Sequence, residues 1–249
     1  TLLRDLMRAT GAGQLQLHYQ PKLDVRSGQV QAAEALMRWQ HPELGTVSPA
    51  EFIGLAERGG LMHELTLWAL AQAVGQIARW REAGLTLELS VNLSVLDLQH
   101  RTLPERLAQL LADSGVPAQA LTLEITETSV LHESDEVRRV LGDLCDLGVA
   151  LSIDDFGTGY SSLAYLKRLP ISELKIDKSF VQDTPDDPSD TAIVQSILSV
   201  ASHLNLRVVA EGVETRAQAD FLLQNQCECL QGYLFGRPEP LAVWLARQV

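Results

Sequence analysis

The sequence predicts an α/β protein whose one sheet closes into a TIM-type (β/α)8 barrel with an irregular, antiparallel first strand. Short apolar runs alternate with amphipathic helical patterns along the chain, and parallel neighbouring strands need such crossover helices. The length of 249 residues, of which 46% are hydrophobic, suits one large core. Helices lie between most of the runs, and only the first two runs are separated by a turn too short to hold one. An open doubly wound sheet is the alternative class.

Each predicted strand is a short apolar or alternating run bounded by Gly, Pro, Asp or Asn. The strands cover residues 15–20, 30–36, 86–92, 121–125, 150–154, 173–176, 207–210 and 228–231. Amphipathic helices are predicted at 61–82, 104–114, 135–147, 190–204 and 215–224. The turn at 24–28 is too short to hold a helix. We expect residues 1–249 to form one domain, with residues 1–10 as a helical lead-in from an upstream module, because the chain begins without methionine.

The charge and hydropathy of the chain limit the binding partners and the cellular compartment that can be expected for it. The formal net charge is -12 and no cluster of Lys and Arg occurs, which disfavours binding to duplex nucleic acid. No stretch approaches 18 apolar residues and no signal peptide opens the sequence. We therefore expect this domain to be cytoplasmic, while an inner-membrane anchor elsewhere in a longer protein stays open.

The cysteines indicate neither a disulfide framework nor a zinc site. Cys145 is isolated on a helical pattern, and no further Cys or His stands at regular spacing beside Cys227 and Cys229. Buried thiols are therefore expected for the pair. The histidines form no constellation with Ser and Asp that would suggest a hydrolytic triad.

Polar residues recur at the carboxyl ends of successive predicted strands. In a barrel these ends share one rim, where active sites are built. Taken singly, Asp155 could cap a helix, Glu124 could be a solvated strand residue and Lys175 could form a surface ion pair. Their coincidence across strands favours one central site. The residues are Glu34, Asn92, Glu124, Asp154, Asp155, Lys175, Glu211 and Gln231.

The five carboxylates on this rim predict bound cations. Two unit charges about 4 Å apart repel by roughly 4 kcal/mol at an effective dielectric near 20, so unaided ionisation of all five is unfavourable. Oxygen ligands without histidine suit Mg²⁺ or Mn²⁺ better than zinc. The adjacent Asp154 and Asp155 favour a pair of ions over one. Ca²⁺ is expected to inhibit, because its coordination is longer and looser.

Over nearly the whole chain the sequence resembles the EAL domain family. Met37 stands where the family more often has leucine. A three-residue motif alone is weak, but an ordered series at matching spacing is specific. The motifs are Tyr19-Gln20-Pro21, Glu34-Ala35-Leu36 with Arg38, Val91-Asn92-Leu93-Ser94, Glu124-Ile125-Thr126-Glu127, Asp154-Asp155-Phe156-Gly157-Thr158-Gly159-Tyr160-Ser161-Ser162-Leu163, Leu174-Lys175-Ile176-Asp177, Ala210-Glu211-Gly212-Val213-Glu214 and Gln231-Gly232-Tyr233 with Arg237-Pro238.

The resemblance implies hydrolysis of the bacterial second messenger cyclic di-GMP to linear pGpG with two Mg²⁺ or Mn²⁺ ions. It also implies a homodimer and an upstream sensory, diguanylate cyclase-like or membrane module. Carried over by motif, the metal ligands are Glu34, Asn92, Glu124, Asp154, Asp155 and Glu211, with Asp154 shared. The catalytic residues are Glu34, Lys175, which orients the attacking water, and Glu211, which positions or deprotonates it. The substrate contacts are Gln20, Leu36, Arg38, Asn92, Gln231 and Tyr233.

The segment after Asp155 is expected to be a mobile loop because of Gly157 and Gly159, with Ser161 or Ser162 capping the next helix. It is not a dinucleotide fingerprint, since Ser162 stands where a third glycine belongs. The resemblance implies that Glu127 anchors this loop.

Two other functions stay open: a degenerate receptor that binds cyclic di-GMP, and a Mg²⁺ enzyme that abstracts a proton with Lys175. The complete ligand set disfavours the first and the ordered motifs disfavour the second.

Overall fold

The computed structural model describes residues 1–131, 134–159, 166–241 and 243, and within them the strands close into a barrel. The closure comes from β1, which pairs antiparallel with both β2 and β9, while the remaining neighbours in the barrel are parallel. The predicted barrel with an antiparallel first strand is confirmed, and the open sheet is excluded. The barrel strands are β1 (Leu15–Asp24), β2 (Gln29–His41), β4 (Glu88–Leu93), β5 (Leu121–Thr126), β6 (Ala150–Phe156), β7 (Glu173–Ile176), β8 (Arg207–Ala210) and β9 (Cys229–Gln231).

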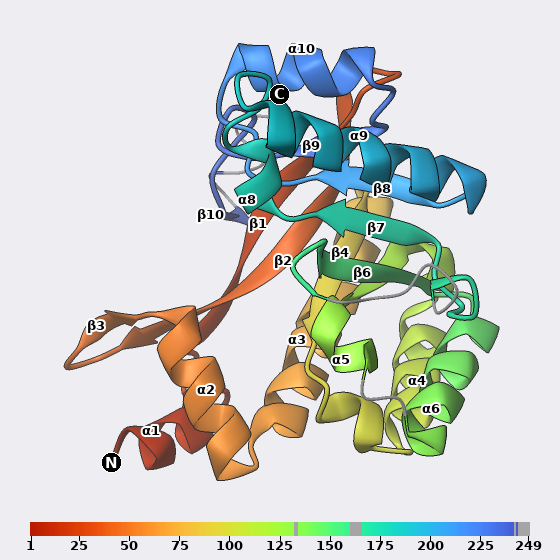
Figure 1. Ribbon diagram of the computed structural model, residues 1–249. Coiled ribbons are helices and arrows are strands. Elements are labelled where there is room, and N and C mark those ends of the chain that lie inside the picture. Colours follow the sequence, from red (N-terminus) through yellow and green to blue (C-terminus); the bar gives the residue numbers. More distant parts are fainter. Residues whose placement is uncertain (132–133, 160–165, 242, 244–249) are drawn as a thin grey trace.

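The hairpin of β1 and β2 is longer than predicted, and the part that extends beyond the barrel contributes to a second hydrophobic cluster. Its register runs from Leu15 opposite Trp39 to Asp24 opposite Gln29, and Figure 1 shows the hairpin extending from the barrel toward α1, α2 and β3. These are α1 (Leu2–Ala9), α2 (Pro49–Gly59) and β3 (Gly45–Val47). Phe52 and Leu6 pack with Leu15 and Trp39 in a second hydrophobic cluster. A helix thus does occupy the first residues, whereas its role as a lead-in stays a prediction.

The predicted helices are present within two residues of their expected bounds. Gln218 and Thr215 form a reciprocal capping box at the start of α10, and Asp187 accepts hydrogen bonds from two backbone N–H groups at the start of α9. The helices are α3 (Met62–Glu82), α4 (Leu103–Ser114), α6 (Asp135–Asp146), α9 (Pro188–His203) and α10 (Arg216–Gln224). Shorter elements are η1 (Asp97–Gln99), η2 (Ala118–Ala120), α5 (Glu127–Leu131), α8 (Lys178–Val181) and β10 (Glu239–Pro240).

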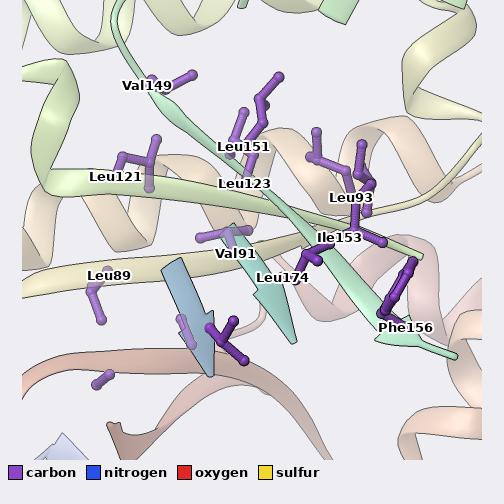
Figure 2. Close-up of a cluster of buried hydrophobic side chains, with 14 of the residues drawn as sticks. Leu89, Val91, Leu93, Leu121, Leu123, Val149, Leu151, Ile153, Phe156 and Leu174 are labelled. Carbon is purple, nitrogen blue, oxygen red and sulfur yellow. The ribbon is translucent and has the colours of Figure 1, made fainter. Parts of the chain in front are cut away.

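The barrel strands separate an apolar layer from a polar interior. Figure 2 shows leucine, isoleucine and valine side chains of β4, β5, β6 and β7 gathered in one cluster, among them Leu123 and Ile153. Since strand residues alternate between faces, the intervening positions point into the barrel. Many of those positions are polar and buried, for example Ser90, Ser152 and Glu124, although Val209 is apolar. The apolar core therefore lies between strands and helices, and the barrel interior is left for charge.

Among the described helices, none combines the length and apolar character that crossing a bilayer requires. Cys227 and Cys229 are buried free thiols, as expected, and Cys145 is exposed. Burial raises the pKa of Cys227 to about 12 and that of Cys229 to about 11, so neither thiol ionises near neutral pH.

Candidate active site

Lys175 lies at the centre of the predicted rim. Its Nζ is 2.5 Å from Glu124 Oε2, 2.8 Å from Glu211 Oε1, 3.1 Å from Asp154 Oδ1 and 3.4 Å from Glu34 Oε2. Side chains from β2, β5, β6, β7 and the end of β8 thus meet at one point. Lys175 and Glu124 have no exposed surface, so the alternatives of a surface ion pair and a solvated strand residue are wrong.

Amide side chains hold Glu34 in place. Asn92 donates from Nδ2 to Glu34 Oε1 at 2.7 Å, and Gln231 donates from Nε2 to Glu34 Oε2 at 2.6 Å. Gln231 Nε2 also contacts Gln20 Oε1 at 3.1 Å, and Gln20 donates to the carbonyl of Gly236 at 3.2 Å. Both ends of the chain therefore contribute to one network, and three predicted substrate contacts lie in it.

The carboxylates fall into two sets that could each hold a cation. One set is Glu34, Glu124 and Asp154, and the other is Asp154, Asp155 and Glu211; within each set one oxygen per residue lies within 4.8 Å of the others. Asp154 belongs to both. All the donors are hard oxygens, which suits Mg²⁺ or Mn²⁺. The residues fit two divalent ions sharing one carboxylate, in the arrangement expected for a binuclear centre.

A β-bulge lets the two neighbouring aspartates, Asp154 and Asp155, reach the same site. The pairing of β6 with β7 shifts between Ile153 and Phe156. Asp155 has a φ of 54°, a left-handed conformation that Asp tolerates better than most residues, and its N–H donates to Asp154 Oδ1 at 2.9 Å. Without the bulge, adjacent strand residues would face opposite sides of the sheet. The bulge thus lets Asp155 join the second set.

Burial and the positive charge of Lys175 together set the pKa values of the acids in the site. Burial raises the pKa of Glu211 to about 8 and that of Asp154 to about 6, although Lys175 opposes both shifts. Burial acts in the same direction on Glu124, but Lys175 and Lys22 outweigh it and lower its pKa to about 2. Burial likewise lowers the pKa of Lys175, and the surrounding carboxylates raise it well above its usual value. The charge of Lys175 is therefore too small to keep all of these acids ionised.

Glu127 fastens the segment that follows the bulge. Its Oε2 accepts hydrogen bonds from the N–H groups of Gly157 and Gly159, both at 3.0 Å. A Cβ on Gly159 would lie 2.9 Å from the carboxyl carbon of Glu127, and one on Gly157 would lie 2.8 Å from Phe180 Cε2. Close approach therefore requires glycine at both positions. Ser161 and Ser162, the expected helix caps, lie outside the described residues.

Only some of the residues predicted to contact substrate lie near one another. Gln20, Gln231 and Tyr233 line a hollow of about 290 Å³ beside Glu211. Tyr233 is half exposed, and its ring lies beneath the guanidinium of Arg237 at 4.3 Å. By contrast, Leu36 and Arg38 lie farther along β2 and do not line this hollow; both are half-buried. Arg38 donates to the carbonyl of Met37 at 2.8 Å.

Sequence reasoning missed Lys22, a second buried lysine inside the barrel. Its Nζ is 2.6 Å from Glu124 Oε1 and 2.7 Å from Ser90 Oγ. The signal was available, because Lys22 stands two residues after Gln20 and a strand places such positions on one face. The predicted strand ended at residue 20, which hid this relation. Asp177, which is hydrogen-bonded to Asp155, was likewise predicted only as part of the motif Leu174-Lys175-Ile176-Asp177, with no role of its own.

Comparisons with known proteins agree with this geometry. The family model described as EAL domain matches residues 3–238. The bifunctional diguanylate cyclase/cyclic di-GMP phosphodiesterase MucR of Pseudomonas aeruginosa is 44% identical over 246 residues, 98% of this chain and 36% of that protein. The cyclic di-GMP phosphodiesterase NbdA of the same organism is 46% identical over 239 residues, 96% of this chain and 30% of that protein.

A solved structure described as the PaMucR phosphodiesterase in complex with c-di-GMP matches with a TM-score of 0.92 and 44% identity, over 98% of this chain and 99% of that chain. The chain spans about a third of the length of the curated relatives MucR and NbdA. The fold, the rim of acids and the family match over residues 3–238 lead to the same assignment, and the chain belongs to the EAL domain family.

Proposed function

We propose that this chain is a divalent-metal-dependent phosphodiesterase that hydrolyses cyclic di-GMP to linear 5′-pGpG. The observation that carries the proposal is the meeting of four carboxylates around Lys175 at the carboxyl end of the barrel. Relatives named as cyclic di-GMP phosphodiesterases, at 46% and 40% identity, support the choice of substrate.

The residues that would hold the cations follow from the two carboxylate sets. Glu34, Asn92 and Glu124 would bind one Mg²⁺ or Mn²⁺, Asp155 and Glu211 the other, and Asp154 both. When bound, such a pair polarises a phosphodiester and lowers the pKa of a neighbouring water. For Asn92 this requires its carbonyl oxygen, which is not used in the hydrogen bond that its NH₂ group donates to Glu34.

The chain's own residues then act on water and phosphate. Lys175 orients the attacking water and offsets the charge of the acids around it. Glu211, which would also be a ligand of the second cation, positions or deprotonates that water. The water oxygen bonds to phosphorus, the bond from phosphorus to O3′ breaks, and a proton passes to the departing O3′. One water is consumed, and the product carries a 5′-phosphate.

Substrate binding is assigned to the residues around the rim. Arg38 faces a phosphate, where a planar cation offsets the negative field of the site. Gln20 and Tyr233, which line the hollow beside Glu211, contact a guanine. Leu36, Asn92 and Gln231 complete the contacts.

The cellular location, the oligomeric state and the neighbouring modules are also part of this proposal. The chain acts in the cytoplasm as a homodimer, joined in a longer protein to a sensory, diguanylate cyclase-like or membrane module. Its coverage of about a third of MucR and NbdA is compatible with such an arrangement.

Incubation with Mn²⁺ and cyclic di-GMP, followed by chromatography, tests the reaction. Appearance of pGpG supports the proposal. Tight binding without any product would contradict it and would favour a receptor instead. Glu34→Gln is the matched inactive control, because it keeps the size of the side chain and its place beside Asn92 while removing a metal ligand.

A further inference from the structure

A second lysine supports the carboxylate cluster from inside the barrel. Lys22 lies on β1 with 2% of its surface exposed. Its Nζ is 2.6 Å from Glu124 Oε1, 2.7 Å from Ser90 Oγ and 3.9 Å from Glu173 Oε1, and the last distance is too long for a hydrogen bond. The ammonium group is therefore committed to Glu124 and Ser90.

The lysines on β1 and β7 divide the two oxygens of Glu124 between them. Lys22 takes Oε1 at 2.6 Å and Lys175 takes Oε2 at 2.5 Å. Glu124 has no exposed surface, so water does not replace a lost donor. A buried carboxylate oxygen without a donor is costly, and the side chain would turn to regain one.

Lys22 belongs to a layer that lies beneath the predicted site. Three residues of this layer stand two positions before or after a residue of the rim on the same strand. Ser90 precedes Asn92, Glu173 precedes Lys175, and Lys22 follows Gln20 on the antiparallel strand. Inward positions of neighbouring barrel strands stack in such layers. Lys22 is thus close to a rim carboxylate without lining the hollow beside Glu211.

We propose that Lys22 is a positioning residue that holds the carboxylate of Glu124 with Oε2 turned toward the cation-binding cluster. This inference rests on the proposed function, since it assigns Lys22 a role in preparing one of the ligands. With Lys22 absent, Oε1 loses its donor and both oxygens of Glu124 turn to compete for Lys175. The carboxylate is then withdrawn from the first cation set, and metal binding weakens.

The test compares Mn²⁺ binding in single variants of the metal-stripped chain. Lys22→Met keeps the length of the side chain and removes the ammonium group. Lys167→Met makes the same change at an exposed lysine, and Ser90→Ala removes the other partner of Lys22 while leaving Glu124 in contact. Calorimetry, at a temperature where circular dichroism shows each variant folded, gives the Mn²⁺ dissociation constant without substrate.

We expect Lys22→Met to weaken Mn²⁺ binding by about tenfold or more, the usual effect of losing a residue that orients a metal ligand. Lys167→Met should leave it unchanged, and Ser90→Ala should have a smaller effect than Lys22→Met. In turnover assays the half-saturating Mn²⁺ concentration should rise, whereas kcat at saturating Mn²⁺ and the KM for cyclic di-GMP should stay near the wild-type values. A loss of general stability would not produce this split.

Wild-type Mn²⁺ affinity in folded Lys22→Met would overturn the inference. If that variant does not fold, Lys22→Gln keeps a donor for Oε1 and should show an intermediate loss of affinity. Failure of both variants to fold would assign Lys22 to stability and would also overturn the inference. A wild-type chain that neither binds Mn²⁺ nor forms pGpG would reject the proposed function itself, which is a different outcome from an unaffected Lys22→Met.

Discussion

Glu211 Oε1 lies 2.8 Å from Lys175 Nζ, yet the pKa of the Glu211 carboxyl is raised to about 8. Burial is the main cause, and Asp154 and Glu34 add to it while Lys175 opposes it. The buried lysine contacts four carboxylates, so its single positive charge is too small to keep Glu211 ionised as well. Protons and cations therefore compete for this site.

The pH dependence follows from this competition. Glu211 and Asp154 have pKa values of about 8 and about 6 in the folded chain, above their values in the unfolded chain, so without metal the folded state binds more protons. Their contribution to stability is present at acid pH and is lost as pH rises from about 4 to about 8. Mn²⁺ should therefore raise the melting temperature more at pH 8 than at pH 6, and activity should fall at mildly acid pH. Equal thermal shifts at both pH values in scanning calorimetry would contradict this expectation.

Glu127→Ala should lower turnover and weaken Mn²⁺ binding, because Gly157 and Gly159 lose the carboxylate that accepts from both of their N–H groups. We expect an effect of about tenfold on metal affinity, since Asp155 lies at the start of this segment. Steady-state kinetics and calorimetry measure the two quantities. Glu105→Ala, at an exposed glutamate, is the control, and wild-type values in Glu127→Ala would refute the role of anchor.

Gly159→Ala should reproduce the effect of Glu127→Ala, because the new Cβ would lie 2.9 Å from the Glu127 carboxyl carbon. Gly142→Ala is the matched control: its Cβ would meet nothing within 4 Å, and the change sits in a helix, where alanine is the better former. The double variant of Gly159 and Glu127 should be little worse than either single variant, since both act on one contact. Additive losses in kcat would show that the two residues act separately.

The features predicted best from the sequence are those that follow from the regular alternation of side chains along a strand and of strands with helices along the chain. Alternation along strands and the shared rim of a parallel barrel are enough to predict that Glu34, Glu124, Asp154, Lys175 and Glu211 meet at one site. The same rules located each barrel strand, because apolar runs bounded by turn residues mark buried strands. The antiparallel β1 followed from the short turn after it, which cannot hold a crossover helix.

The remaining features depend on contacts between distant segments. Pairing with β2 and β9 extends β1 to Asp24, and only this extension brings Lys22 inside the barrel. The bulge at Asp155 depends on the register of β7, which local sequence does not specify. Arg38 and Leu36 were placed by motif alone, and the backbone of β2 carries them past the hollow that Gln20 and Tyr233 line. The spacing of residues therefore predicts which face of a strand a side chain occupies, but it does not predict which side chain of another strand lies next to it in the barrel.

Lys175→Met should destabilise the metal-free chain by about 3–5 kcal/mol, the usual cost of leaving buried carboxylates without their partner. Turnover should fall by about 10²-fold or more with the loss of a positioned cation. Added Mn²⁺ should recover part of the stability but not the turnover, because cations would take over the charge of Lys175 without orienting water. Chemical denaturation with and without Mn²⁺ measures the first quantity. Recovery of full activity in Mn²⁺ would show that Lys175 serves only as a counter-charge.

Ca²⁺ should bind to the two carboxylate sets and inhibit. Asp154 is common to both sets, so two ions bound to them would lie close together around one carboxylate. Ca²⁺ takes more ligands at longer distances, so two such ions would be spaced poorly around one shared carboxylate. Titration of Ca²⁺ into the Mn²⁺-loaded enzyme should lower the rate of pGpG formation, and excess Mn²⁺ should restore it. Full turnover with Ca²⁺ as the sole cation would contradict the requirement for compact coordination.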